Sequence, residues 1–261
     1  MRPVDEMERA VGIAEPVLVA APLGAPARIA ADLVPGSCTA VPYEHPGHAG
    51  TPALPRASSM SDFAHAALRA GTRSAPGPMA IVGVGFGAMV ALQAALDQPH
   101  RVSCLVVISG SAAPGNSEGW GERAAAARTG GLESLAPAIV SRWLTAELRS
   151  ARPQLLRELR AALMTCGNEG YAVACEAIAS FDISHRLGQI EAPTMVVAGA
   201  EDVGVPPEHG RRLAYEMPNA IYHELAGAGH LPFLDCPDLV RALVSQHLAA
   251  TLLGRPSGGE S

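Results

Sequence analysis

The sequence of 261 residues contains little of what marks several specialised classes of protein. Only 17% of its residues are charged and 4% are aromatic, and its formal net charge of −6 comes without a stripe of lysine and arginine. Such a chain is poorly suited to binding nucleic acid or an anionic membrane. No apolar run approaches the ~20 residues that a membrane span requires. With 48% hydrophobic residues, the chain can instead bury a large core.

The pattern of cysteines also lacks the spacing that is typical of disulfide scaffolds and of structural metal sites. The five cysteines are scattered, odd in number and without a CxxC pair, which argues against a disulfide scaffold and a structural zinc site. The first sixteen residues carry Asp5, Glu6 and Glu8 and lack the basic start and apolar run of a signal peptide. We therefore expect a cytoplasmic protein.

Short apolar runs separated by helical patterns dominate what the sequence does contain. Six runs are typical of buried parallel strands, at residues 17–21, 38–42, 79–84, 103–109, 194–199 and 220–225. Helical spacing of apolar residues appears at 58–70, 86–96, 207–217 and 237–253. This alternation predicts an α/β fold with a mostly parallel, doubly wound sheet.

One region interrupts the alternation. Residues 114–187 show helical patterns and no convincing strand, so we expect a helical cap inserted over the carboxyl edge of the sheet, where such sheets bind ligands. The core would then consist of residues 1–113 and 188–253. The tail, 254–261, is rich in glycine, serine and proline and is expected to be disordered.

The clearest chemical signal is a glycine-dense turn between an apolar run and a helical pattern. Gly83, Gly85 and Gly87 have the spacing of the G-x-S-x-G nucleophile elbow, with Gly85 at its centre. The turn also matches a dinucleotide-binding fingerprint that ends in alanine, at Ala88. Against that alternative, the turn follows the third predicted strand rather than the first, and the next strand does not end in an acidic residue. We expect no cofactor and no metal.

Two further residues complete the pattern. Asp202 follows the predicted strand 194–199, and His230 follows the strand 220–225. Taken singly, Asp202 is typical of a turn and His230 of a surface. Taken together, in the chain order nucleophile, acid, histidine, they predict the acid and the histidine of a hydrolase triad.

With these residues, the chain resembles the α/β-hydrolase superfamily, and within it the β-ketoadipate enol-lactonase branch. The resemblance spans about residues 17–253 and rests on the elbow, the Asp202 and His230 segments, residues 43–48, the pair Arg142-Trp143, and residues 170–183. It implies an α/β-hydrolase fold in which Gly85 replaces the serine nucleophile. It also implies an oxyanion hole formed by the backbone N–H groups of Leu23 and Phe86, with substrate contacts from Arg142 and Trp143. A solvated position for Arg142 is the alternative.

That superfamily opens with an antiparallel hairpin, and this sequence departs from it. The sixteen residues before the first predicted strand do not look like two strands. The sequence therefore leaves open a sheet of six strands, all parallel, with 38–42 at one edge. A bare edge invites pairing, so a homodimer formed there is one hypothesis.

Without a side chain at Gly85, no acyl-enzyme can form there, but a His230–Asp202 dyad can still act as a general base or acid. The leading hypothesis is an enzyme acting on a small lactone, ester or β-dicarbonyl compound. It would use water-activated hydrolysis or proton-transfer chemistry of the lyase, isomerase or cyclase kind. The alternatives are a non-catalytic ligand-binding protein, an engineered nucleophile-less variant of an enol-lactonase-like serine hydrolase and, last, a nucleotide-cofactor oxidoreductase. Ser109, Ser111 and Cys104 have no elbow around them and receive little weight as nucleophiles.

Overall fold

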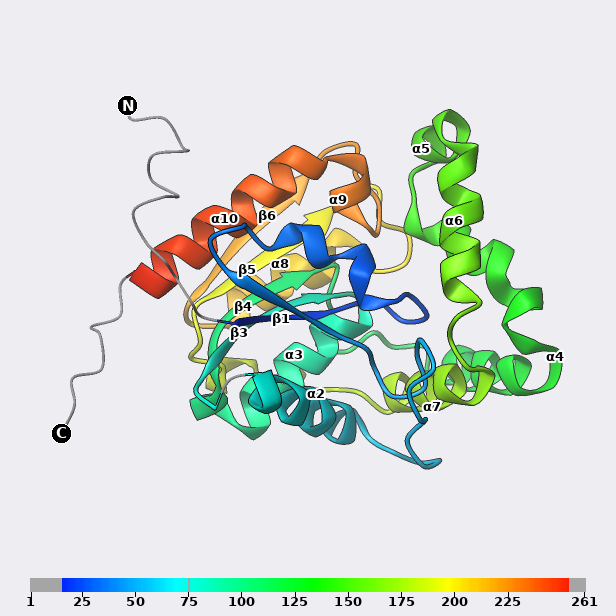
Figure 1. Ribbon diagram of the computed structural model, residues 1–261, viewed down its shortest axis with the longest axis horizontal. Helices are drawn as coiled ribbons and strands as arrows, with labels where there is room; N and C mark the ends of the chain where they lie inside the picture. Colours follow the sequence, from blue (N-terminus) through cyan, green and yellow to red (C-terminus); the bar gives the residue numbers. More distant parts are fainter. Residues whose placement is uncertain (1–15, 75, 254–261) are drawn as a thin grey trace.

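A single six-stranded sheet forms the centre of the computed structural model, which describes residues 16–74 and 76–253. The strand order is β2-β1-β3-β4-β5-β6, and each neighbouring pair is parallel (Figure 1). The strands are β1 (Pro16–Ala20), β2 (Thr39–Tyr43), β3 (Met79–Val84), β4 (Val102–Ile108), β5 (Thr194–Gly199) and β6 (Ala220–Leu225).

This sheet confirms the predicted α/β class. Within the described residues its six strands are all parallel and the second strand lies at an edge, which is the arrangement that the sequence left open. β3, β4 and β5 are buried along their whole length, which explains why they read as continuous apolar runs rather than alternating ones. β2 and β6 lie at the edges and are only partly buried. The hairpin question falls on residues 1–15 and the predicted disorder on residues 254–261, both outside the described residues.

Helices cover both faces of the sheet. The short helices η1 (Ala27–Ile29) and η2 (Ala31–Leu33) share one face with α10 (Pro237–Leu253), while α2 (Met60–Ser74) and α3 (Phe86–Asp97) pack against β1, β3 and β4 from the other (Figure 1). α8 (Pro207–Glu216) packs on β5 and β6, and η3 (Pro99–Arg101) precedes β4. Eleven consecutive residues of α3, Phe86 to Leu96, are buried, so this alanine-rich helix is the central one of its layer.

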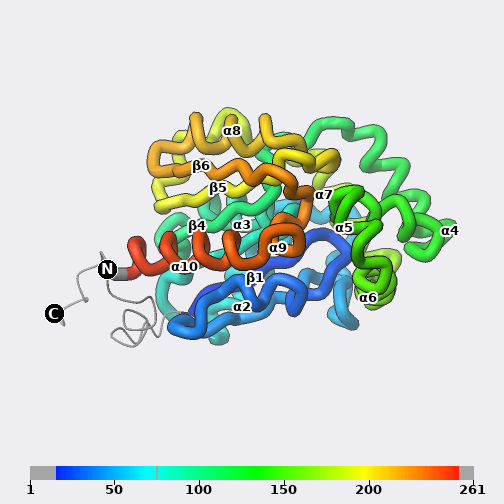
Figure 2. Tube along the Cα trace, turned by 90° about the horizontal axis from the view of Figure 1, so that it is seen from above, coloured from blue at the N-terminus to red at the C-terminus, as the bar shows by residue number. Residues whose placement is uncertain are grey.

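The helical insert lies between β4 and β5, beyond the carboxyl ends of the strands (Figures 1 and 2). It consists of α4 (Ser117–Trp143), α5 (Ala146–Ala151), α6 (Pro153–Leu163) and α7 (Asn168–Ala179), followed by η4 (Ser184–Gln189). α4 is bent at Gly131, whose φ of 71° and ψ of 167° are not helical. The sequence predicted this insert as a helical cap. Across the described part of the chain, no helix is long and apolar enough to cross a membrane.

Candidate active site

The turn that carries Gly85 has the geometry of a nucleophile elbow. Gly85 joins β3 directly to α3 with φ 54° and ψ −111°, in the left-handed region that side chains rarely adopt. Its N–H donates to the carbonyl oxygen of Ile108 at 2.8 Å, and the N–H of Ala88 donates to the Gly85 carbonyl at 3.1 Å. The backbone around it therefore holds a sharp strand-to-helix turn without any side chain at its centre.

Asp202 and His230, separated by 28 positions in the sequence, form a dyad. Nδ1 of His230 donates to Oδ2 of Asp202 at 2.8 Å. The other carboxylate oxygen accepts the N–H groups of Gly204 at 2.8 Å and Val205 at 2.9 Å. The Asp202 side chain is fully buried, while that of His230 remains 13% exposed. Three hydrogen bonds thus fix the carboxylate, and the carboxylate fixes the tautomer of the ring.

The free nitrogen of this ring faces Gly85. An ideal Cβ placed on Gly85 would lie 3.0 Å from Nε2 of His230 and 3.5 Å from Cβ of Pro22. Because Nδ1 is engaged by Asp202, a neutral His230 presents its Nε2 lone pair to the space over Gly85. The structure thus brings together Gly85, Asp202 and His230, as the sequence predicted.

The two predicted oxyanion-hole residues lie on adjoining turns. Leu23 belongs to the turn after β1, which is bonded to the elbow because Gly87 N–H donates to the Ala21 carbonyl at 3.1 Å. Phe86 is the first residue of α3. Neither the N–H of Leu23 nor that of Phe86 donates to an acceptor in residues 16–74 or 76–253. Two unengaged donors beside the dyad are what an oxyanion requires, and their role in stabilising one stays a prediction.

A pair of buried histidines anchors the turn of Leu23, a role that the sequence reasoning did not assign. Nε2 of His45 donates to the Ala21 carbonyl at 2.9 Å, and Nε2 of His48 accepts the N–H of Gly24 at 3.0 Å. The ring of His45 also packs against that of Phe86, with centroids 4.8 Å apart. These two histidines therefore contact both turns that carry the unengaged donors. The available signal was a pair of histidines three positions apart, directly after a strand.

Burial keeps both rings uncharged. Desolvation lowers the pKa of His45 to about 3, with the nearby His48 lowering it further. Desolvation likewise lowers the pKa of His48 to about 4. Neutral rings suit the observed hydrogen bonds, because His48 must keep Nε2 unprotonated to accept from Gly24.

Arg142 and Trp143 end α4 and occupy different environments. Trp143 is 5% exposed, and its carbonyl accepts the N–H of Leu231, next to the catalytic candidate His230. Arg142 is exposed. Asp235 fastens this end of the cap to the histidine loop, accepting from Thr145 Oγ1 and from Gly229 N–H at 2.9 Å each. A substrate contact by Trp143 or Arg142 stays a prediction.

The other candidate nucleophiles are buried. Ser109, with a φ of 50°, is 2% exposed, and Ser111 and Cys104 are fully buried. The hydroxyl of Ser111 lies 2.9 Å from Nδ1 of His209 and accepts the N–H of Ala113 at 3.1 Å. Such a hydroxyl stabilises its turn and is not open to a substrate.

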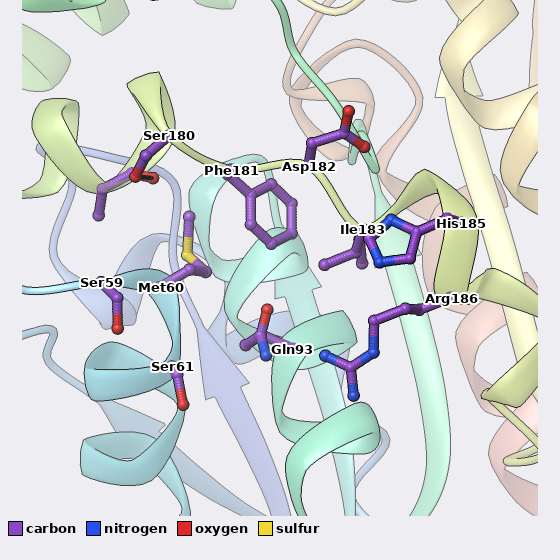
Figure 3. Close-up of a pocket in the computed structure, with 11 residues that line it drawn as sticks. Ser59, Met60, Ser61, Gln93, Ser180, Phe181, Asp182, Ile183, His185 and Arg186 are labelled. Atoms are coloured by element: carbon purple, nitrogen blue, oxygen red, sulfur yellow. Dashed lines mark hydrogen bonds between the residues drawn. The ribbon is translucent and has the colours of Figure 1, made fainter.

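A pocket of about 260 Å³ opens between α2, α3 and the segment after α7. In Figure 3, Phe181, Gln93 and Arg186 point toward one shared space, while Asp182 points away. Gln93 lies about 10 Å along α3 from Phe86 at 1.5 Å per residue. None of the predicted site residues lines this pocket. Within the described residues, no group of three or more histidine, cysteine, aspartate and glutamate side chains could hold a metal ion.

Comparison of the sequence with models of known protein families identifies the family of this chain. Residues 17–243 match the model of the Alpha/beta hydrolase family. The chain belongs to the alpha/beta hydrolase family. One curated relative in this family is 3-oxoadipate enol-lactonase 2 of Acinetobacter baylyi, 28% identical over 155 residues. That alignment covers 59% of this chain and spans only 58% of the relative's length.

Other relatives match over more of their length. The pimeloyl-[acyl-carrier protein] methyl ester esterase of Chromobacterium violaceum is 30% identical over 235 residues, covering 85% of this chain and 88% of the relative. Among solved structures, the enol-lactonase from Burkholderia xenovorans superposes with a TM-score of 0.85 at 25% identity, covering 90% of this chain and 92% of that one. The chain is therefore similar to hydrolases of esters and lactones.

Proposed function

We propose that this alpha/beta hydrolase hydrolyses a small ester or lactone in a single step, with water as the nucleophile and His230 as general base. Gly85 takes the place that the serine nucleophile occupies in the enol-lactonase-like members of the family. Asp202 orients the His230 ring, and the N–H groups of Leu23 and Phe86 stabilise the oxyanion. No covalent intermediate forms in this reaction.

The observation that supports the proposal is the position of the His230 ring, whose Nε2 atom faces the space above Gly85. Nε2 of His230 lies 3.0 Å from where a Cβ of residue 85 would be, and Asp202 holds Nδ1 at 2.8 Å. A general base must lie within hydrogen-bond reach of the proton that it removes. With no hydroxyl on Gly85, a water molecule is the group that can occupy that reach.

The reaction balances with one water consumed. Nε2 of His230 accepts a proton from the water as the water oxygen bonds to the carbonyl carbon. Negative charge collects on the carbonyl oxygen, where the N–H groups of Leu23 and Phe86 can donate to it. The bond from carbon to the leaving oxygen then breaks, and the imidazolium returns its proton to that oxygen. An ester gives an acid and an alcohol, and a lactone gives a hydroxy acid.

Kinetics with para-nitrophenyl butyrate and γ-butyrolactone test the proposal. His230→Ala should lower kcat/KM by about 10²–10⁴-fold, the usual contribution of general base catalysis. Asp202→Asn should lower it to a similar degree because the ring loses its correct tautomer. Single turnovers by the unaltered protein should show no burst of nitrophenol and no acylated protein in the mass spectrum. Turnover that survives His230→Ala, or a burst, contradicts the proposal.

Two outcomes would favour the other functions. Binding of a lactone or dicarbonyl compound without turnover, unaffected by His230→Ala, indicates a ligand-binding protein. Exchange of substrate carbon-bound hydrogen with heavy water, without hydrolysis, indicates that the dyad performs proton-transfer chemistry instead. The same Nε2 position serves that reaction, since nothing lies between the base and the space over Gly85.

A further inference from the structure

Within the part of the chain that the structure describes, Arg123 is a half-buried cation in the cap that no carboxylate neutralises. Its guanidinium carbon lies 5.1 Å from the ring centroid of Trp120, one turn earlier in α4, and 5.4 Å from that of Tyr171 in α7. Among residues 16–74 and 76–253, no Asp or Glu oxygen lies within ion-pairing distance of it. Two aromatic faces thus attract this charge without cancelling it.

The neighbouring arginine shows the contrast. Arg128, in the same helix, pairs with Glu169 at 2.9 Å and with Glu176. The two arginines face the same partner helix, α7, yet the carboxylates of α7 serve only one of them. Partly buried charges in proteins are normally paired, because removing a charge from water is costly. An unpaired guanidinium in this environment is therefore available for an anion from outside the chain.

A buried hydroxyl lies beside this charge. Tyr171 is fully buried, and its phenol oxygen makes no hydrogen bond of ordinary geometry within the described part of the chain, but it does interact with the Arg123 side chain. Burial raises the pKa of Tyr171, while the charge of Arg123 acts in the opposite direction, so the phenol stays protonated at neutral pH. A neutral phenol beside the guanidinium does not cancel the charge of Arg123.

The position of Tyr171 connects this cation to the site. A Cβ on Gly24 would lie 3.2 Å from Cε2 of Tyr171, and Gly24 directly follows Leu23. One aromatic ring therefore separates the Arg123 charge from the turn that carries a predicted oxyanion donor. Within the described residues no carboxylate engages the N–H donors of this guanidinium, so these donors are available to bind a ligand.

We propose that Arg123 binds a carboxylate carried by the substrate at the end remote from the reacting carbonyl, and so selects half-esters and acid-bearing lactones over uncharged ones. This inference rests on the proposed function and assigns its substrate class. Arg123 acts as a specificity-determining residue. It takes the role that the sequence suggested for Arg142, which is exposed.

Two esters of equal chain length test this role. The mono-para-nitrophenyl ester of glutaric acid ends in a carboxylate, and para-nitrophenyl valerate ends in a methyl group. Arg123→Met should raise KM for the glutarate ester about tenfold or more, the value of a charged hydrogen bond, with kcat changed much less. KM and kcat for valerate should stay within about twofold, which also shows that the variant is folded. Arg123→Lys should recover part of the loss, and Arg157→Met, at an exposed position of α6, is the matched control that leaves both esters unchanged.

Several results overturn the inference. They are an equal KM for the glutarate ester in the unaltered protein and Arg123→Met, an equal loss with valerate, or a loss confined to Arg142→Met. If neither ester is turned over, the proposed function fails, and calorimetry with monomethyl glutarate decides the inference separately. Binding that weakens about tenfold or more in Arg123→Met supports it. No binding to the unaltered protein, or equal binding to the variant, rejects it.

Discussion

Gly47 and Gly170 meet backbone to backbone, and a Cβ added to Gly170 would lie 2.4 Å from the Cα of Gly47. The contact seats the loop after β2 on α7, and Gly167 N–H adds a hydrogen bond to the Gly47 carbonyl at 2.9 Å. The same loop carries His45 and His48. The packing of the cap and the anchoring of the Leu23 turn therefore depend on one close approach.

Gly170→Ala should lower the free energy of unfolding by about 1–3 kcal/mol, because the new methyl group meets backbone that cannot move aside cheaply. The measurement is urea unfolding followed by circular dichroism. The matched control is Gly121→Ala, also within a helix, where a Cβ meets nothing within 4 Å. That change should stabilise by up to about 1 kcal/mol through helix propensity. Equal effects of the two changes would show that the contact is unimportant.

Gly85→Ser should create a covalent route at a cost in stability. At φ 54° and ψ −111° a side chain adds about 1–3 kcal/mol of strain, and His230 must shift by a few tenths of an ångström from the new Cβ. We expect a nitrophenol burst and faster ester hydrolysis from the variant. Gly85→Ala should lose the same stability without gaining a burst. A serine variant that stays inert would mean that the donors or the dyad are not arranged for acyl transfer.

Acid should destabilise the protein through its buried histidines. The pKa of His48 is about 4 and that of His45 about 3, both below the ordinary value of 6.5. As the pH falls below 6.5, these histidines take up protons in the unfolded chain but stay neutral in the folded one. The free energy of unfolding therefore decreases until the pH reaches the pKa values of the folded state. The slope is at most about 1.4 kcal/mol per pH unit for each ring.

His48→Gln should make this slope shallower by about 1 kcal/mol per unit between roughly pH 6 and 5, since one titrating ring is removed. Glutamine can still accept the N–H of Gly24. Urea unfolding at several pH values measures the slope. His100→Gln, at an exposed position, is the control and should leave it unchanged. An unaltered slope in His48→Gln would show that this ring does not stay neutral.

The Arg128 cluster should contribute measurably to the attachment of α4 to α7. Hydrogen bonds from Arg128 first, and then from Arg56, lower the pKa of Glu169 to about 2. Arg128→Met should cost about 1–2 kcal/mol at low salt and less at high salt, since half-exposed pairs are screened. Arg160, 3.7 Å from the exposed Glu133, provides the comparison. Its change to methionine should cost no more than about 0.5 kcal/mol.

The sequence predicted the sheet well because buried parallel strands leave a plain signal. The strands Met79–Val84, Thr194–Gly199 and Ala220–Leu225 and the helix Pro237–Leu253 begin and end where the apolar patterns predicted. β4 and β2 are displaced by one residue, and α2 runs four residues beyond its predicted end. The spacing of apolar residues identifies a helix or a strand. The residues at which it begins and ends depend on hydrogen bonds, which that spacing does not reveal.

The dyad was predictable and its surroundings were not. Asp202 and His230 follow strands, and parallel strands bring their carboxyl ends to one edge, so topology alone places the two residues near each other. The bonds of His45 and His48 to the Leu23 turn join residues 24 positions apart with no periodic signal. Which arginine of the cap is partly buried depends on how α4 packs on α7. The sequence around Arg123 and Arg142 does not distinguish the two.

The lack of a side chain at Gly85 determines which chemical probes can detect this protein. Fluorophosphonate and β-lactone probes, which define the serine hydrolases of a cell, react with an activated hydroxyl. Gly85 offers none, and the nearby hydroxyls of Ser109 and Ser111 are buried. Such probes should therefore fail to label this chain at position 85. If His230 activates water as proposed, a survey by covalent labelling would count this chain as inactive, whereas an inhibitor that resembles the tetrahedral adduct, such as a phosphonate anion, should still bind.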